Sequence, residues 1–257
     1  MPEELPAAPH ARPGLYVGCS GWQYKHWRGD FYPAKMPVSR WLEYYASHFA
    51  TVELNNSFYR LPAAQSFDMW RQRVPASFVY AVKASRYITH MKKLKEPAAS
   101  IDLLFSRATH LKDALGPVLY QLPPRWPLNI ERFKTFLEAL PSNFIHVVEF
   151  RDPTWYVTDV FEALEKHGVS LCLHDMEGSE TGLRRVGPVV YLRFHGPAKY
   201  RGRYPETRLE AAAAWCAESL LAAAPVYAYF NNDIGGHAPR DAVRFRELTR
   251  KSAGLRD

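Results

Sequence analysis

The chain contains eight short, hydrophobic, β-rich segments, and most of them end in a polar or charged residue. The segments span residues 15–20, 51–55, 78–83, 118–121, 146–151, 170–174, 189–195 and 226–231. Each is rich in Val, Leu, Phe and Tyr and is bounded by Gly, Pro or polar residues, which is typical of buried strands. Strand alternating with helix in a chain of 257 residues predicts the α/β class, as a single (β/α)8 TIM barrel with a parallel sheet and outer helices.

Apolar residues at helical spacing lie between most of these strands. The expected helices span residues 41–48, 64–73, 101–115, 129–140, 158–167, 207–224 and 238–251. Asn129 is the expected N-cap of the fourth of these helices, and Gly116 and Gly168 are positioned as C-terminal caps. The connection after the sixth strand, around residues 178–183, has no helical pattern.

Side-chain parity predicts which residues line the interior of the barrel. Alternate side chains of a strand point to opposite faces, and in a barrel one face meets the helices while the other lines the interior. In the segment 189–195, Tyr191, Arg193 and His195 share one face, and the other face is apolar. The same reasoning places these residues inside, near the C-terminal end: Glu53, Asn55, Glu149, Arg151, Arg193, His195 and Asn231, with Ser20, Lys83, Gln121 and His174 ending the other strands.

Several charges inside a barrel need a reason, because a buried charge is costly unless it is paired or lies in a wet pocket. One interpretation is a set of internal ion pairs, in which Glu53 and Glu149 neutralise Lys83, Arg151 and Arg193 and hold the top of the barrel together. The other is an active site, and it is favoured because the active sites of such barrels lie at the C-terminal ends of the strands.

Composition agrees with one globular domain, since 47% of the residues are hydrophobic. We expect a barrel domain at residues 14–251, a flexible arm at 1–13 and a tail at 252–257. The arm has no apolar run that could act as a secretory signal or span a bilayer, which predicts a cytoplasmic protein. The net charge of +7 favours anionic partners without identifying one.

Ordered motifs run along nearly the whole chain, from about residue 15 to residue 248. They include Gly-Cys-Ser-Gly-Trp at 18–22, Ala-Val-Lys-Ala at 81–84, Glu-Phe-Arg at 149–151, Arg-Phe-His-Gly at 193–196 and Phe-Asn-Asn-Asp at 230–233. Together they resemble the domain of unknown function 72 (YecE-like) family. The resemblance implies a TIM-type barrel in a bacterial-type cytoplasmic protein with no assigned activity, and a similarity to phosphodiesterase-type DNA-repair nucleases. Cys19 stands where the motif usually has Thr, on the parity opposite Ser20, so we expect no functional consequence.

The residue types at the barrel mouth favour chemistry on an anion. Lys83, Arg151 and Arg193 form the expected clamp for a phosphate or carboxylate. Glu149, His195 and Glu53 are the expected catalytic residues, with His195 or Glu149 as general acid or base and a carboxylate raising the pKa of His195. The remaining candidates for substrate binding are Asn55, Gln121, Asn231 and Asn232, which could also cap turns, and Trp22, Tyr59 and Trp155, which could also be packing.

A metal site is weakly indicated, and no cofactor is predicted. Glu149, His174, Asp175, His195 and Asp233 are possible ligands, but three nearby cations would repel a divalent ion. The absence of a Gly-rich phosphate loop disfavours a dinucleotide cofactor. Two functions remain: a hydrolase or lyase acting on a phosphorylated or otherwise anionic substrate, or a nucleic-acid-binding protein or metal-assisted phosphodiesterase. The basic run at 86–95 is compatible with the second, and equally with an ordinary solvated loop. The sequence does not predict an oligomeric state.

Overall fold

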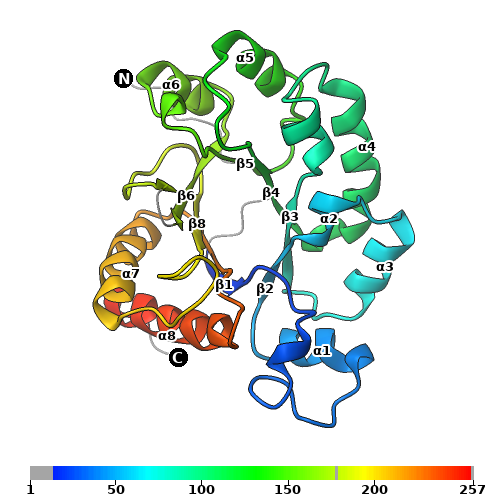
Figure 1. The fold of residues 1–257 in the computed structure, drawn as a ribbon, viewed down its shortest axis with the longest axis vertical. Helices are drawn as coiled ribbons and strands as arrows, with labels where there is room; N and C mark the ends of the chain where they lie inside the picture. The colour runs from blue at the N-terminus through cyan, green and yellow to red at the C-terminus, as the bar shows by residue number, and fades with distance from the viewer. Residues whose placement is uncertain (1–13, 177–178, 256–257) are drawn as a thin grey trace.

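The computed structural model describes residues 14–176 and 179–255, and within them eight parallel strands form a nearly closed barrel (Figure 1). The strands are β1 (Leu15–Cys19), β2 (Thr51–Leu54), β3 (Val79–Lys83), β4 (Leu115–Gln121), β5 (His146–Glu149), β6 (Ser170–Met176), β8 (Val190–Phe194) and β9 (Val226–Phe230). Their order around the barrel is β1-β9-β8-β6-β5-β4-β3-β2. The predicted α/β barrel is therefore confirmed, and the predicted arm at 1–13 lies outside the described residues.

Helices surround the ring of strands (Figure 1). They are α1 (Trp41–Ala46), α2 (Asn56–Tyr59), α3 (Ala64–Gln72), α4 (Ala98–Ala108), α5 (Ile130–Glu138), α6 (Thr158–Lys166), α7 (Glu206–Leu221) and α8 (His237–Ser252). Short turns of helix lie in the connections: η1 (Lys25–Trp27), η2 (Val38–Arg40), the π-helix η3 (Tyr87–Met91), η4 (Thr109–Ala114) and η5 (Pro153–Trp155). None of the helices among the residues with described positions is both long and apolar enough to cross a bilayer.

The predicted helix caps have different outcomes. The side chain of Asn129 accepts a hydrogen bond from the backbone N–H of Arg132, which confirms it as the N-cap of α5. The C-terminal cap at Gly116 is wrong, because α4 ends at Ala108 and Gly116 already lies in β4. A Cβ at Gly116 would lie 2.3 Å from Cγ1 of Val79. This glycine therefore allows β3 and β4 to approach, rather than ending a helix.

The predicted parity is confirmed by two separate hydrophobic clusters. The inner cluster contains Val79, Ala81, Leu119, Val147, Cys172, Tyr191, Tyr227 and Tyr229, which lie on the same parity as the polar strand-end residues. The outer cluster contains the alternate residues of the same strands, such as Val148, Leu192 and Phe230, together with the inner faces of the helices. The tyrosines therefore form an aromatic floor below the polar mouth.

The connection between β6 and β8 differs from the others, as its sequence predicted. The short strand β7 (Ser179–Glu180) pairs antiparallel with β6, and no helix lies between β6 and β8 in the described part of the chain. This arrangement leaves the outer face of β6 and β8 uncovered beside α7, where a pocket forms.

Candidate functional site

Glu53 and Arg193 form a buried ion pair at the centre of the mouth. Arg193 Nη2 lies 2.9 Å from Oε1 of Glu53, and Arg193 Nε lies 3.0 Å from its Oε2. Two hydroxyl groups also donate to this carboxylate: Ser20 Oγ at 2.8 Å and Tyr191 Oη at 2.7 Å. The carboxylate of Glu53 is therefore held in one orientation by Ser20 at the end of β1 and by Tyr191 and Arg193 of β8.

Glu149 joins both guanidinium groups of the mouth. Its Oε2 accepts from Nη1 of Arg193 at 2.8 Å, and its Oε1 accepts from Nε and Nη2 of Arg151. Burial alone would raise the pKa of Glu149, but Arg151 and Arg193 outweigh burial and hold this pKa well below its usual value. The carboxylate is consequently charged at neutral pH and is a weak base.

His195 is neutral, which corrects one of our expectations. Its Nε2 lies 3.1 Å from Nη2 of Arg151 and 3.3 Å from Nη1 of Arg193. Because a guanidinium can only donate, Nε2 must accept, and the ring proton lies on Nδ1. Burial, followed by the charges of Arg193 and Arg151, lowers the pKa of His195 well below 6.5, although Glu149 opposes this shift. We expected a nearby carboxylate to raise the pKa of His195, and burial together with the two cations lowers it instead.

Lys83 is the cation of the mouth that lacks a counter-charge. Its ammonium nitrogen lies 4.4 Å from the centre of the Phe58 ring, and it makes no ion pair or hydrogen bond with any described side chain. The residue is only 8% exposed. Burial lowers its pKa to about 8, with Arg193 and Arg151 acting in the same direction and Glu149 and Glu53 against it.

The polar residues of β6 face two different regions. His174 points inward, where its ring nitrogens pair with Ser179 Oγ at 3.0 Å and Thr181 Oγ1 at 3.1 Å. Asp175 points outward, accepts the backbone N–H of His195 at 2.7 Å and also accepts from the Tyr204 hydroxyl. Burial lowers the pKa of His174 to about 4 and raises that of Asp175 to about 6.

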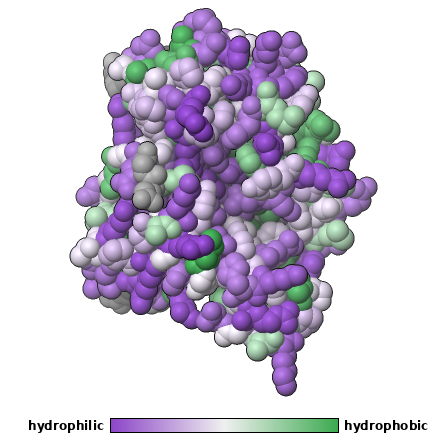
Figure 2. Space-filling view, viewed as in Figure 1, coloured by the Kyte–Doolittle hydropathy of each residue, from purple (hydrophilic) through white to green (hydrophobic). Residues whose placement is uncertain are grey.

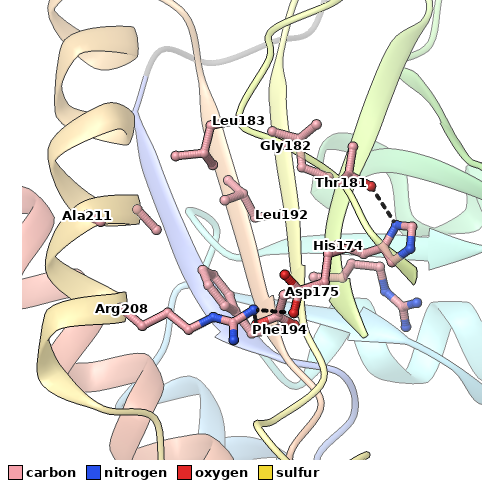
Figure 3. A pocket seen from close by; sticks show the side chains of 13 residues that line it. His174, Asp175, Thr181, Gly182, Leu183, Leu192, Phe194, Arg208 and Ala211 are labelled. Carbon is pink, nitrogen blue, oxygen red and sulfur yellow. Dashed lines mark hydrogen bonds and ion pairs between the residues drawn. The ribbon is translucent and has the colours of Figure 1, made fainter. Parts of the chain in front are cut away.

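Asp175 also borders the pocket between β6, β8 and α7, which has a volume of about 230 Å³ (Figure 3). Arg208 of α7 reaches across it, with Nη2 at 3.7 Å from Oδ2 of Asp175. The pocket has a largely apolar wall, which includes Leu173, Leu192 and Phe194. It lies beside the barrel wall, whereas the charge cluster lies at the mouth, and the two regions meet at His174 and Arg193.

The four candidate amides have different surroundings. Asn232 is buried and donates to Gly202 O at 2.9 Å and to Asp241 Oδ2 at 2.8 Å, and its Oδ1 has no partner within the described chain. Asn55 donates to Ser20 O at 3.2 Å, while its buried Oδ1 has no partner within the described chain. Gln121 and Asn231 are half-buried at the ends of β4 and β9, on the inward parity. Asn55, Gln121 and Asn231 therefore remain candidates for ligand binding.

The candidate aromatic residues are mainly packing. Trp155 is fully buried, donates its indole N–H to Trp126 O at 2.7 Å and stacks on Phe150. Trp22 is also buried and packs edge-on against Trp70. The packing alternative accounts for both, because no ring face is left open for a ligand. Tyr59, in contrast, is 73% exposed beyond the end of β2.

The possible metal ligands do not converge. Within residues 14–176 and 179–255, no group of three or more His, Cys, Asp or Glu side chains is arranged to hold a metal ion. Asp175 points away from the mouth, and Asp233 lies 3.5 Å from His26 in a separate contact. Around Glu149 and His195, the nearest charged groups are guanidiniums, which occupy the places that a cation would need.

Parity reasoning did not predict that Ser20 and Tyr191 donate hydrogen bonds to Glu53. Both were predicted to face inward, but their role depends on which carboxylate lies opposite.

Figure 2, drawn in the same view as Figure 1, shows a mainly hydrophilic face that is hollowed near its centre. The arrangement combines a network of two carboxylates and two guanidiniums with one additional cation, Lys83.

Comparisons with known proteins agree on one family. The model for "Protein of unknown function DUF72" matches residues 16–256. UPF0759 protein YunF of Bacillus subtilis is 27% identical in an alignment 271 residues long, and the match covers 91% of this chain and 94% of that protein. A solved DUF72 family structure from Thermotoga maritima is 27% identical with a TM-score of 0.81, covering 91% of this chain and 98% of that chain. A DUF72 family structure from Enterococcus faecalis has a TM-score of 0.77 at 16% identity, covers 95% of this chain and 97% of that chain, and shows the fold alone.

Proposed function

The chain belongs to the DUF72 family, whose function is unknown, and from the charges at its barrel mouth we propose that it is an enzyme acting on a small anionic substrate. The observation that carries this proposal is the unpaired charge of Lys83. Arg151 and Arg193 are balanced by Glu53 and Glu149, so Lys83 leaves a surplus of one positive charge in a nearly buried place. Such a surplus is costly, and a bound anion would remove the cost.

The proposal gives separate roles to the paired and unpaired groups. Glu53 and Glu149 hold Arg193 and Arg151 in fixed orientations. Nη1 of Arg151 contacts only Met176 Sδ, at 2.7 Å, among the described atoms, and sulfur is a weak acceptor. A carboxylate or phosphate oxygen is a stronger partner for this group than sulfur. The anion would therefore be bound between Lys83 and Arg151.

The type of reaction within this proposal is hydrolysis or lyase chemistry. Glu149 and His195 remain candidates for proton transfer, but both are engaged by guanidinium groups, and neither titrates near neutral pH. A group that works as an acid or base is most effective when its pKa lies near the working pH. Lys83 meets this condition with a pKa of about 8.

Calorimetric titration with inorganic phosphate tests the proposed anion site. We expect Lys83→Gln to weaken phosphate binding by about 10-fold or more, because a charge-assisted hydrogen bond contributes about 1.5–3 kcal/mol. Lys134→Gln is the matched control, because Lys134 is an exposed lysine on α5 and lies outside the mouth. Equal phosphate affinity in both variants would contradict the proposal.

The nucleic-acid alternative gives a different result in the same assay. A single-stranded oligonucleotide that neutralises several cations would bind with an affinity that falls steeply with salt. If such an oligonucleotide displaced phosphate and showed this dependence, a nucleic-acid substrate would replace the small anion. A weak salt dependence with retained phosphate binding supports the small substrate.

A further inference from the structure

The position of Lys83 suits a reactive amine. Lys83 ends β3, and its backbone carbonyl accepts a hydrogen bond from Ser57 Oγ at 2.7 Å, which fixes the start of its side chain. The side chain points into the mouth on the inward parity, and its end lies over the Phe58 ring. Because the residue keeps 8% exposure, it is shielded without being sealed from the solvent.

Burial is the largest factor that keeps this amine partly neutral, and charged groups on or directly after β2, β5 and β8 add to it or oppose it. Arg193 of β8 and Arg151 after β5 lower the pKa of Lys83 further. Glu149 of β5 and Glu53 of β2 raise it, but burial and the two arginines outweigh them. His90 of η3 also interacts with Lys83, and it is itself neutral, with a pKa that burial lowers to about 4. With a pKa of about 8, about a tenth of Lys83 is free amine at pH 7.

We propose that Lys83 is a nucleophile that forms an imine with the carbonyl group of the anionic substrate, an inference that rests on the proposed function. The Nζ lone pair attacks the carbonyl carbon, and the new C–N bond forms as the C=O π bond breaks. Nζ loses its protons to the oxygen through solvent, and the oxygen leaves as water. Amine and carbonyl are thereby converted to imine and water, with no oxidant or reductant.

The surroundings of Lys83 also suit the product of this step. A protonated imine is a cation at the position of Nζ, where it would lie over the same face of Phe58 and be stabilised by the ring. Arg151 would hold the carboxylate or phosphate of the substrate. The iminium withdraws electrons from the neighbouring carbon, which favours cleavage of a C–C or C–H bond and selects the lyase among the two reaction types.

Reductive trapping on the full-length chain tests the imine. Glyoxylate, which carries an aldehyde and a carboxylate, is added at pH 7 with sodium cyanoborohydride, and modified lysines are identified by peptide mass spectrometry. We expect Lys83 to be modified at least about 10-fold faster than the exposed Lys134, because part of Lys83 is free amine and the neighbouring Arg151 would hold the glyoxylate carboxylate beside it. Inorganic phosphate should slow this modification by occupying the anion site. In Lys83→Arg, which keeps the charge but has no nucleophilic amine, only background labelling should remain.

The outcomes distinguish this inference from the proposed function. Modification of Lys83 no faster than that of Lys134, with phosphate binding that still requires Lys83, would overturn the imine and leave the anion site intact. Fast modification of Lys83 at a rate that phosphate does not change would overturn the proposal that the substrate is an anion. The comparison of Lys83 with Lys134 and the competition by phosphate both use the wild-type chain, so these two readouts do not depend on whether a variant folds.

Discussion

Glu149 and Arg193 are both fully buried, and each is neutralised by the other. Glu149→Gln keeps the shape of the side chain but leaves Arg151 and Arg193 with one carboxylate between them. Removing one partner of a buried pair typically costs about 3–5 kcal/mol, so we expect a loss of this size in the free energy of unfolding, measured by urea denaturation. Glu131→Gln is the control, because Glu131 is 83% exposed and lies 3.7 Å from Lys134. Equal losses of free energy of unfolding in both variants would show that the charge of Glu149 contributes no more to stability than an exposed carboxylate does.

The sequence predicted which residues meet at the mouth, because side-chain direction has a period of two along a strand. One of its two interpretations paired Glu53 and Glu149 with the three cations, and the structure shows such pairs with Arg151 and Arg193. The sequence did not predict which carboxylate meets which cation, because that choice depends on distances across the barrel. Burial and the same limit explain why the pKa of His195 is lowered rather than raised. Parity places carboxylates and cations around the ring, but only the fold shows that two guanidiniums contact Nε2.

Gly196 follows His195 directly and has a φ of 87°. A Cβ at this position would lie 2.5 Å from Arg201 O and 2.9 Å from Asn232 Cβ. Gly29 has a similar φ of 90° with nothing within 4 Å, so Gly29→Ala measures the cost of backbone strain alone, about 1–2 kcal/mol. We expect Gly196→Ala to lower the free energy of unfolding by more than Gly29→Ala. Equal losses by urea denaturation would mean that the loop around Arg201 moves aside freely.

At the scale of elements, the barrel is joined between β1 and β2 by a side chain. The backbone N–H of Cys19 donates to Tyr45 Oη at 2.7 Å, and Tyr45 Oη donates to Thr51 O at 3.0 Å. A Cβ at Gly18 would lie 2.2 Å from Thr51 O, so the two strands approach closely at this point. The hydroxyl of Tyr45 therefore replaces a direct backbone hydrogen bond between the strands.

Tyr45→Phe removes this bridge and leaves a buried N–H and a buried C=O without their partner. We expect the free energy of unfolding to fall by about 1–3 kcal/mol, measured by urea denaturation. Tyr44→Phe is the matched control, because Tyr44 is the neighbouring residue of α1 and its hydroxyl makes no hydrogen bond among the described residues. A loss no greater in Tyr45→Phe than in Tyr44→Phe would show that the seam holds without the hydroxyl.

The elements that the sequence predicted best are those with a local pattern. Asn129 could be identified as an N-cap because its partner, the N–H of Arg132, lies three residues away. The role of Gly116 was predicted wrongly because a glycine is needed there to make room for the side chain of Val79 on the neighbouring strand. No local sequence pattern contains that contact. The bridge made by Tyr45 was missed for the same reason, since helical spacing identifies Tyr45 only as a core residue.

At the scale of the whole molecule, buried histidines make stability depend on pH. Burial lowers the pKa of His146 and of His174 to about 4, and the pKa of His195 falls well below 6.5. The unfolded chain therefore binds protons below about pH 6.5 that the folded chain does not bind, and stability falls as the pH drops from about 6.5 to 4. Asp175 acts in the opposite direction, because its raised pKa of about 6 lets the folded state bind a proton first.

His146→Gln tests this dependence away from the mouth. His146 lies at the start of β5, with Nε2 at 2.8 Å from Pro141 O, and a glutamine amide can donate to the same carbonyl. A lowered pKa of about 4 corresponds to about 3 kcal/mol that His146 removes from the free energy of unfolding between pH 7 and pH 4. We expect the loss of stability over this range, measured by urea denaturation, to be smaller in His146→Gln by an amount of this order. The Glu149 pairs contribute little to the difference, because the lowered pKa of Glu149 keeps this carboxylate charged over the range. An unchanged pH dependence in the variant would mean that His146 takes up its proton in the folded state as readily as in the unfolded chain.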